Sequence, residues 1–385
     1  MMVSNGSWQG RFPQNEIISL LNVNRRFNLA ESTSQDMSFG ELLDMADCEQ
    51  LRELKLGYGS SAGDLALRQA VGIACNVAPD EVLTTQGTAL GLFLIAFELC
   101  RPGDEVVLVS PCFPPSRDAL LGNGIKIIDV PVFFDDGFTI DIGRVAAALT
   151  SRTRLVSLAS PQNPSGVATS VDDINSLLDM MKIYAPQAQL FVDETYREAV
   201  YGEATTPPSV AGLDKRIITG ASISKALGAP GLRTGWLTIP DPSLYARLEM
   251  AKMNMVISGS VLDEALAAVL MLKRQTVLLP RRKLLEKAMA MLEHWCEVER
   301  ARIEWVRPDG GAMCCIRLRI DVFDDEAISR FRALLPEYEV QLAGGHWFGA
   351  DARVFRLGFG YLPLPEFERA LAALSLALSS ALCRA

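Results

Sequence analysis

Residues 216–239 read RIITGASISKALGAPGLRTGWLTI, two short apolar runs on either side of a polar, glycine-rich segment. Similar runs, rich in Val, Ile or Leu and bounded by Gly, Pro or Asp, recur upstream: EVVLVS from Glu105, IKIIDVPVF from Ile125, RLVSLAS from Arg154 and AQLFVDE from Ala188. Helix-length segments such as VDDINSLLDMMKIYA separate several of them. Continuous apolar strands that alternate with helices indicate a mostly parallel sheet covered on both faces, so the sequence predicts a three-layer α/β/α domain.

The pattern changes downstream of this region. Helical segments dominate from about residue 240 to 300, and the strand-like runs AMCCIRLRI and RVFRLGFG then precede an amphipathic helix that begins near Leu364. This order predicts a smaller α+β domain. Residues 1–45 lack clear periodicity, and we expect them to pack on that smaller domain. The predicted division is a large domain over residues 46–260 and a small domain built from residues 1–45 and 261–385.

Composition narrows the class of protein. The 385 residues include 37 Lys+Arg and 46 Asp+Glu, which gives a net charge of −9 at pH 7 with histidine neutral. Proteins that bind nucleic-acid backbones usually have a basic footprint, so we expect no nucleic-acid partner. The N-terminus lacks a secretory pattern, and no uncharged apolar run of ~18 residues occurs. We therefore expect a cytoplasmic protein that does not insert into a membrane.

Cysteine and histidine usage bounds the chemistry. The eight cysteines are scattered without a CxxC pair, which favours reduced thiols over a disulfide framework. Only two histidines occur, His294 and His346, so a histidine-rich metal site is nearly excluded and we predict no metal. Neither histidine lies in a context that is typical of a Ser-His-Asp triad.

The segment around Lys225 is the strongest functional signal. Lys225 follows an apolar run, and Arg233 lies eight residues further on in a glycine-rich setting. Ser222, Ser224 and Arg233 can hold an anion while Lys225 presents an amine, which suits a Schiff base with a phosphate-bearing aldehyde. A lysine at a strand end is, on its own, usually a solvated surface residue, so the surrounding pattern carries the interpretation.

The pattern SxSKxxxxPGLRxGW resembles the lysine motif of fold-type I pyridoxal-phosphate enzymes, specifically the class I and II aminotransferases of the aspartate aminotransferase superfamily. Other segments match that family in the same order: YGSSAGDLALRQAV from Tyr58, TTQGTALG from Thr84, SPCFPPS from Ser110, PQNPSG from Pro161, DETYRE from Asp193 and FRLGFG from Phe355. The resemblance, which runs from about residue 55 to the end, implies an aminotransferase that depends on pyridoxal 5'-phosphate. Such an enzyme moves an amino group between an amino acid and a 2-oxo acid, and we expect a homodimer with shared active sites.

The resemblance also implies the catalytic residues. Lys225 would form the Schiff base, and Asp193 would keep the pyridine nitrogen protonated so that the ring acts as an electron sink. Tyr196 and Asn163 would donate to the phenolate oxygen of the cofactor and tune the acidity of the Schiff base. Arg356 would clamp the substrate carboxylate, because a guanidinium binds a carboxylate with two parallel hydrogen bonds, and Asn163 would also contact the substrate.

The remaining cofactor contacts are implied in the same way. The phosphate would be bound by Gly87 and Thr88 at the start of a helix, with Ser222, Ser224 and Arg233. Phe113 would stack on the ring, and Tyr58 would cross into the site of the neighbouring subunit. The large domain would thus be the cofactor-binding one.

Plainer interpretations exist for several of these residues. Asp193 can cap the next helix, Asn163 can belong to a simple Asn-Pro turn, and Thr88 can be an N-cap without a ligand. Tyr196 and Phe113 can be ordinary core aromatics. For the carboxylate clamp, Arg353 competes with Arg356, and only one can reach the site because positions 353 and 356 of a strand face opposite sides.

Two segments depart from the family pattern, and both bear on the reaction. Glu31, Ser32, Thr33 and Ser34 stand where many members have a glycine near the substrate carboxylate, and Gly344–Trp347 stands where many members read PGxxFG. The stretch ESTSQDMSFGEL resembles amino-acid-modifying relatives, such as capreomycidine-synthase-like enzymes, that use the fold without transamination. Elimination, cyclisation or oxidation of an amino acid is therefore the alternative to transamination.

A third reading is a regulator that uses this fold as a sensor. Such fusions carry a DNA-binding domain at their N-terminus, for which we expect no room before Tyr58. The stretch GYGSSA (57–62) also fits a dinucleotide-binding pattern. The charged run that precedes it does not read as a buried strand, however, so that interpretation is weak.

Overall fold

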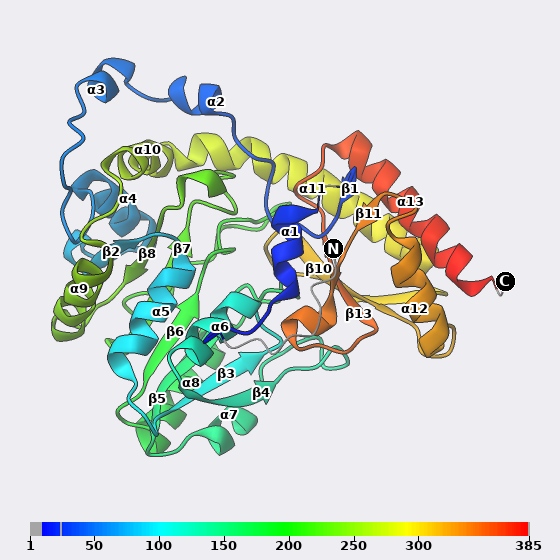
Figure 1. Ribbon diagram of the computed structural model, residues 1–385, viewed down its shortest axis with the longest axis horizontal. Coiled ribbons are helices and arrows are strands. Elements are labelled where there is room, and N and C mark those ends of the chain that lie inside the picture. The colour runs from blue at the N-terminus through cyan, green and yellow to red at the C-terminus, as the bar shows by residue number, and fades with distance from the viewer. Residues whose placement is uncertain (1–9, 24, 384–385) are drawn as a thin grey trace.

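A seven-stranded sheet forms the larger part of the molecule (Figure 1). The computed structural model describes residues 10–23 and 25–383. Neighbouring strands in the sheet follow the order β2 (Val82–Thr85), β8 (Gly235–Thr238), β7 (Ile217–Ser222), β6 (Gln189–Asp193), β5 (Thr153–Ala159), β3 (Glu105–Ser110) and β4 (Lys126–Pro131). Strand β8 runs antiparallel to β2 and β7, and the other pairs are parallel. The mostly parallel sheet expected from the apolar runs is confirmed.

Helices cover both faces of this sheet. Along β3, Val106 and Leu108 pack into one apolar cluster, whereas Val107 and Val109 pack into another. Alternate side chains of a strand point to opposite faces, so each cluster belongs to one layer of helices. The first layer contains α5 (Thr88–Leu99), α6 (Pro114–Gly122) and α9 (Pro242–Val256), and the second contains α7 (Ile142–Ala148) and α8 (Val171–Tyr184). The predicted three-layer α/β/α architecture is confirmed.

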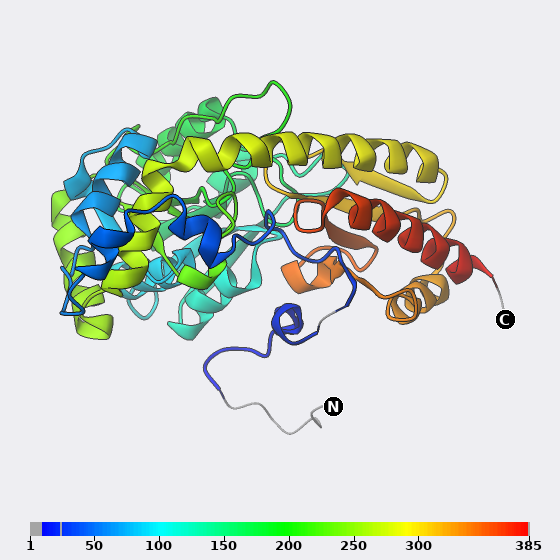
Figure 2. The same cartoon turned by 90° about the horizontal axis from the view of Figure 1, so that it is seen from above.

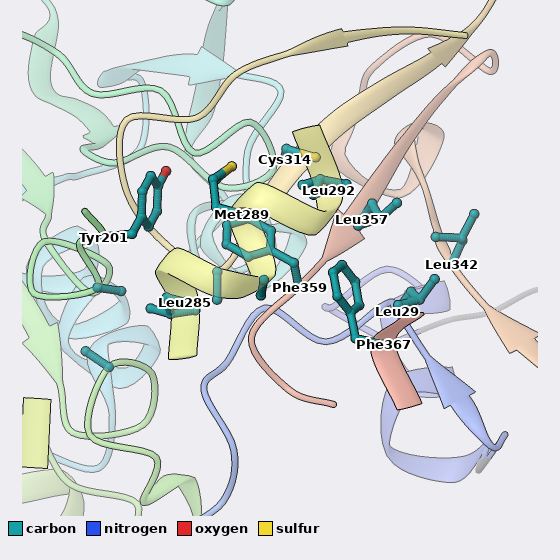
Figure 3. Packing of buried hydrophobic residues seen from close by; sticks show 14 of the residues in the cluster. Leu29, Tyr201, Leu285, Met289, Leu292, Cys314, Leu342, Leu357, Phe359 and Phe367 are labelled. Carbon is teal, nitrogen blue, oxygen red and sulfur yellow. The ribbon is translucent and has the colours of Figure 1, made fainter. Parts of the chain in front are cut away.

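A second, antiparallel sheet forms the smaller part. Its strands follow the order β12 (Ala343–Gly344), β13 (Val354–Gly358), β10 (Met313–Leu318) and β9 (Ile303–Val306). Its helices are α11 (Arg274–Glu299), α12 (Asp325–Leu334) and α13 (Leu364–Leu382). Helix α11 extends from beside the large sheet to the small one (Figure 2). Leu285, Met289 and Leu292 on its inner face join the strands and α13 in one apolar cluster (Figure 3).

The N-terminal segment contacts both parts. After η1 (Glu16–Ile18) and α1 (Ser19–Asn22), strand β1 (Phe27–Asn28) pairs in parallel with β11 (Val340–Gln341). A few residues later the chain reaches the large sheet, where the backbone N–H of Met37 donates to the carbonyl of Gly228 at 2.7 Å. The segment therefore bridges the two parts, and the domain boundaries after residues 45 and 260 stay predictions.

The remaining elements complete the helical cover. Helix α4 (Leu65–Cys75) packs on α10 (Val261–Leu272), while α2 (Phe39–Leu43) and α3 (Cys48–Arg52) lead into α4 (Figure 1). Short 3₁₀ turns are η2 (Pro79–Glu81), η3 (Pro230–Leu232) and η4 (Gly345–Phe348). Within residues 10–23 and 25–383, none of the helices combines the length and apolar character that crossing a bilayer requires.

We expect the cluster in Figure 3 to dominate the stability of the smaller part. Phe367 of α13 is 0% exposed, so Phe367→Ala should lower the free energy of unfolding by about 3–5 kcal/mol, through lost burial and an unfilled cavity. The control is Leu376→Ala on the same helix, whose side chain is 57% exposed and should lose far less. Urea denaturation followed by circular dichroism measures both, and equal losses would contradict the packing described here.

Candidate active site

The site residues gather at one edge of the large sheet because of its strand directions. The carboxyl ends of β3, β5, β6 and β7 meet at this edge, since these strands are parallel. Strand β2 ends at the same edge because it is separated from β7 by the single antiparallel strand β8. Antiparallel β8 begins there, so Arg233, just before β8, lies beside Gly87, just after β2. The topology thus brings five separate segments to one place.

Lys225 lies in the loop after β7, and its amine reaches into the site. The Nζ atom is 3.5 Å from the Ser32 hydroxyl and 5.8 Å from the centre of the Tyr196 ring. The Ser32 hydroxyl is in turn 2.9 Å from the Tyr196 hydroxyl. An amine, a phenol and an alcohol therefore share one small space, where protons can be exchanged among them.

Asp193 occupies the end of β6, directly before the turn that carries Tyr196. Its carboxylate accepts a hydrogen bond from the backbone N–H of Thr195 at 3.0 Å. Burial raises the pKa of Asp193, while hydrogen bonds from Thr195 and the positive charge of Lys225 act in the opposite direction. Because burial prevails, Asp193 is a carboxyl group suited to sharing a proton with a basic ligand atom.

Arg356 comes from β13 of the small sheet and is only 1% exposed. Its Nη1 atom donates to Oδ1 of Asn163 at 2.8 Å, and Nη2 donates to the carbonyl of Ala30. Its Nε is buried, and among the described residues no group accepts a hydrogen bond from it. Burial lowers the pKa of Arg356, but a guanidinium stays protonated in proteins, so the site holds a fixed positive charge whose Nε–H is unpaired among the described residues.

Asn163 connects Arg356 to the group around Lys225. It follows β5, it is buried, and its Nδ2 atom donates to the Tyr196 hydroxyl at 3.2 Å. A continuous polar chain thus runs from Arg356 through Asn163, Tyr196 and Ser32 to Lys225. Arg353, the competing candidate, points elsewhere and donates to the carboxylate of Asp325 at 2.9 Å.

Gly87 and Arg233 lie together at the start of α5, a corner whose arrangement suits an anion. Gly87 is the N-cap of this helix, its φ of +81° lies in the left-handed region, and it offers no side-chain cap to the first N–H groups. A Cβ on Gly87 would lie 2.9 Å from Nη2 of Arg233, so the guanidinium stands directly over the helix start. Unpaired N–H groups and a guanidinium together attract an anion.

The other expected cofactor residues lie around this corner. Thr88 is the first residue of α5, and its hydroxyl is 3.1 Å from that of Thr195. Ser222 ends β7, and its hydroxyl accepts from the backbone N–H of Ser224 at 3.4 Å. Their positions agree with the expected phosphate contacts, but their roles stay predictions.

Phe113 and Tyr58 lie in different surroundings. Phe113 is partly buried against a small apolar cluster of Ala30, Ala343 and Phe348. Tyr58 is 87% exposed in the loop before α4, where it is free to contact another molecule. The ring-stacking role of Phe113 and the crossing of Tyr58 remain untested predictions.

Two contact residues were not assigned from the sequence. Ser32 was noted only as a departure from the family pattern, yet its hydroxyl touches both Lys225 and Tyr196. Thr195 supports Asp193 and contacts Thr88. The backbone N–H two residues after an Asp often donates to its carboxylate, so the Thr195 contact could have been predicted from the local sequence. For Ser32, the only indication in the sequence was that it departs from the family pattern.

The second segment that departs from the family pattern, Gly344–Trp347, lies against the N-terminal segment. His346 of η4 contacts the Glu16 carboxylate at 3.0 Å through Nε2, and Trp347 packs against the same apolar cluster as Phe113. Across the described ranges, no group of three or more His, Cys, Asp or Glu side chains is arranged to hold a metal ion.

Both the sequence and the fold of this chain are similar to those of known proteins. The family model for class I and II aminotransferases matches residues 41–374. The chain is similar to the capreomycidine synthase of Streptomyces vinaceus, with 31% identity over 90% of this chain and 88% of that one. It is also similar to the arginine–pyruvate transaminase of Pseudomonas aeruginosa, with 28% identity over 82% of this chain and 81% of that one. The fold is similar to that of the pyridoxal-phosphate-dependent cyclase OrfR, with a TM-score of 0.85, 23% identity, and coverage of 97% of this chain and 100% of the cyclase.

The raised pKa of Asp193 leads to a prediction on stability. A carboxyl group whose pKa is higher in the folded than in the unfolded protein costs stability as pH rises from the unfolded value through the folded one. The cost is complete above the folded pKa. In cofactor-free protein, Asp193→Asn should therefore raise the melting temperature at neutral pH, because the amide keeps the Thr195 contact without the buried charge.

The gain should shrink as pH falls toward the unfolded pKa of Asp, and calorimetric scans at several pH values test this. Asp172→Asn on the exposed face of α8 is the control. A variant at position 193 that is less stable than the parent at every pH would show that burial of this carboxylate is not a cost.

Proposed function

Because the chain belongs to the class I and II aminotransferase family, whose cofactor is pyridoxal 5'-phosphate, we propose that it is a transaminase that moves an amino group between an amino acid and a 2-oxo acid. The observation that supports this most directly is the polar chain from Arg356 to Lys225. It links a cation that can bind a carboxylate to an amine through one network of polar contacts, as an α-amino acid substrate requires.

The residues present fit the cofactor. The start of α5, with Gly87 in a left-handed conformation under Arg233, suits a phosphate. Asp193, whose pKa is raised by burial, suits a protonated ring nitrogen. Lys225 is the amine within reach of Tyr196 and Ser32. When bound, pyridoxal phosphate supplies an aldehyde that condenses with amines and a ring that accepts electrons from a bond broken at the substrate α carbon.

The residues of the chain do the remaining work. Arg356 binds the substrate carboxylate and so orients the bonds at the α carbon. The Lys225 amine would take a proton from that carbon as a general base and would deliver it, as a general acid, to a carbon of the bound cofactor. Asn163 makes hydrogen bonds to both Arg356 and Tyr196, and the Lys225 amine lies 5.8 Å from the centre of the Tyr196 ring, so these two residues relate the positions of Arg356 and Lys225.

A second candidate is cyclisation, elimination or oxidation of an amino acid on the same scaffold. The observation that favours it is Ser32, whose hydroxyl stands between Lys225 and Tyr196 in the divergent segment. A hydroxyl there adds a second group that can accept or deliver a proton beside the amine. The similarity to a capreomycidine synthase and to the cyclase fold also supports this candidate.

We also propose that the active unit is a homodimer. Large apolar side chains are exposed around the loop that carries Tyr58 and on α4, α9 and α10: Leu56, Tyr58, Leu65, Ile73, Met250, Met253, Met255, Ile257, Leu262 and Leu272. Large apolar side chains exposed on neighbouring elements are typical of a protein interface. A second copy that covers it would take Tyr58 toward its own phosphate-binding corner, as the family resemblance implies.

The role of Lys225 has a direct test. Borohydride converts a bond between the cofactor aldehyde and a lysine into a stable amine, so the parent protein should yield a modified peptide that contains residue 225. Lys225→Ala should yield none, whereas Lys287→Ala, at an exposed position on α11, should behave as the parent does. Peptide mass spectrometry reads the result, and an adduct that persists in Lys225→Ala would refute the assignment.

A panel of amino donors distinguishes transamination from the second candidate reaction. Transamination predicts that a donor bleaches the cofactor aldehyde absorbance in one turnover and releases one equivalent of 2-oxo acid. Ammonia release, oxygen uptake or a cyclic product with the aldehyde absorbance restored would instead support the second candidate. Ser32→Ala serves as the matched variant, since a product change that accompanies loss of this hydroxyl would link Ser32 to the outcome.

A further inference from the structure

A buried polar cluster lies beneath the loop that carries Tyr58, and the reactions above do not use it. Lys252 of α9 is 0% exposed, and its Nζ donates to the carbonyl of Ser61 at 2.6 Å and to the Thr84 hydroxyl at 3.0 Å. The Thr84 hydroxyl donates to Oε1 of Glu264 at 2.6 Å, and Oε2 of Glu264 accepts from the backbone N–H of Asp64 at 2.7 Å. We call Lys252, Thr84 and Glu264 the buried hub.

The hub joins three segments that serve different purposes. Thr84 belongs to β2, which leads within three residues to Gly87 of the phosphate corner. Ser61 and Asp64 lie in the loop that presents Tyr58. Glu264 belongs to α10, and the turn before this helix carries the exposed apolar side chain of Ile257. Figure 1 shows β2, α4, α9 and α10 together at the same end of the molecule.

The three segments are closely packed against one another. A Cβ on Gly63, in the Tyr58 loop, would lie 2.1 Å from the Thr84 hydroxyl, and one on Gly259 would lie 2.0 Å from Oε1 of Glu264. The backbones on both sides therefore follow the positions of the hub side chains closely. We therefore expect a shift of β2 near Gly87 to be accompanied by a shift in the loop.

Stability alone does not account for this cluster. Burying a lysine and a glutamate costs solvation energy that their attraction often fails to recover, and apolar residues of similar volume frequently do as well. Burial lowers the pKa of Lys252 to about 8, while Glu264 on α10 and Glu249 on α9 raise it and Arg68 on α4 lowers it. Keeping Lys252 and Glu264 charged therefore costs folding stability. This cost points to a role of the hub in positioning the segments that it joins.

We infer that the buried hub couples the phosphate corner to the subunit interface, so that binding of pyridoxal phosphate and association of two copies strengthen each other. Lys252, Thr84 and Glu264 are positioning residues in this account, because they act through Gly87 and the Tyr58 loop. The inference rests on the proposed cofactor site and homodimer. Thermodynamic linkage requires the coupling factor to be the same from either direction.

The test measures that factor with Lys252→Met, which keeps an unbranched side chain, one atom shorter, and removes its charge. Sedimentation of labelled protein gives the dimer dissociation constant with and without pyridoxal phosphate, and spectroscopic titration gives the cofactor dissociation constant of monomer and dimer. In the parent protein we expect coupling of about tenfold or more, a free energy of roughly 1.4 kcal/mol. Lys252→Met should reduce the factor to about twofold or less, whereas Lys287→Met on exposed α11 should leave it unchanged.

A pH series separates positioning from simple loss of stability. Coupling in the parent should fall as pH rises through about 8, where Lys252 loses its proton and Glu264 loses its counter-charge. In Lys252→Met this transition should be absent. Thr84→Val, which keeps the shape of the side chain and removes the hydroxyl, serves if Lys252→Met does not fold, and it should also weaken the coupling.

The outcomes that overturn the inference are distinct from failure of the proposed function. Coupling that is unchanged in both variants would overturn the hub and leave the transaminase and the dimer intact. A parent protein that binds pyridoxal phosphate but stays monomeric would overturn the hub and the dimer together. A parent protein that binds no pyridoxal phosphate would overturn the cofactor site itself, and with it the inference.

Discussion

The hydrogen bond from Arg356 to Asn163 is the contact on which the candidate active site depends. Arg356 belongs to the small sheet and Asn163 follows a strand of the large sheet, and their side chains meet at 2.8 Å in a buried environment. A hydrogen bond to a charged group typically contributes about 1.5–3 kcal/mol, so this contact favours one fixed relation between the two sheets. Asn163 also donates a hydrogen bond to Tyr196. The Tyr196 hydroxyl contacts that of Ser32, which in turn contacts the Lys225 amine. The amine and the carboxylate-binding cation are therefore placed relative to each other by a chain of polar contacts that spans both parts of the molecule.

The molecule keeps several ionisable groups where burial opposes their charge. Burial raises the pKa of Asp193 and lowers the pKa values of Lys252 and Arg356, so each charged form is disfavoured by its surroundings. The three large apolar clusters supply the stabilisation that tolerates this. Such groups are concentrated where chemistry or positioning requires them, at the carboxyl edge of the sheet and beneath the Tyr58 loop. This is the pattern expected when local stability is sacrificed to function.

Local sequence patterns predicted much of the fold but not all of it. The strands β3 to β8 were legible because runs such as EVVLVS are continuous and apolar, as strands buried on both faces must be. Strand β2 reads VLTT, with two threonines that serve the hub and the loop, so its pattern is too polar and too short to stand out. Strand β9 reads IEWV, and β12 has only two residues. These elements form because neighbouring strands offer them hydrogen-bond partners, which is a property of the assembled sheet.

The sequence by itself determined the family, the cofactor class, and the order of the residue types that carry the chemistry, because motifs such as SISK and DETY are local and keep their spacing in the chain. Only the tertiary structure decided which of these residues meet. Ser32 and Lys225 are 193 residues apart in the chain, as are Asn163 and Arg356, and Thr84 lies 180 residues from Glu264. Contacts at such separations have no signature in local sequence, since they arise from the closure of long chain segments around shared cores. The buried hub therefore became visible only once β2, α9 and α10 were packed together, and the place of Ser32 beside Lys225 only once the N-terminal segment was packed against the loop after β7.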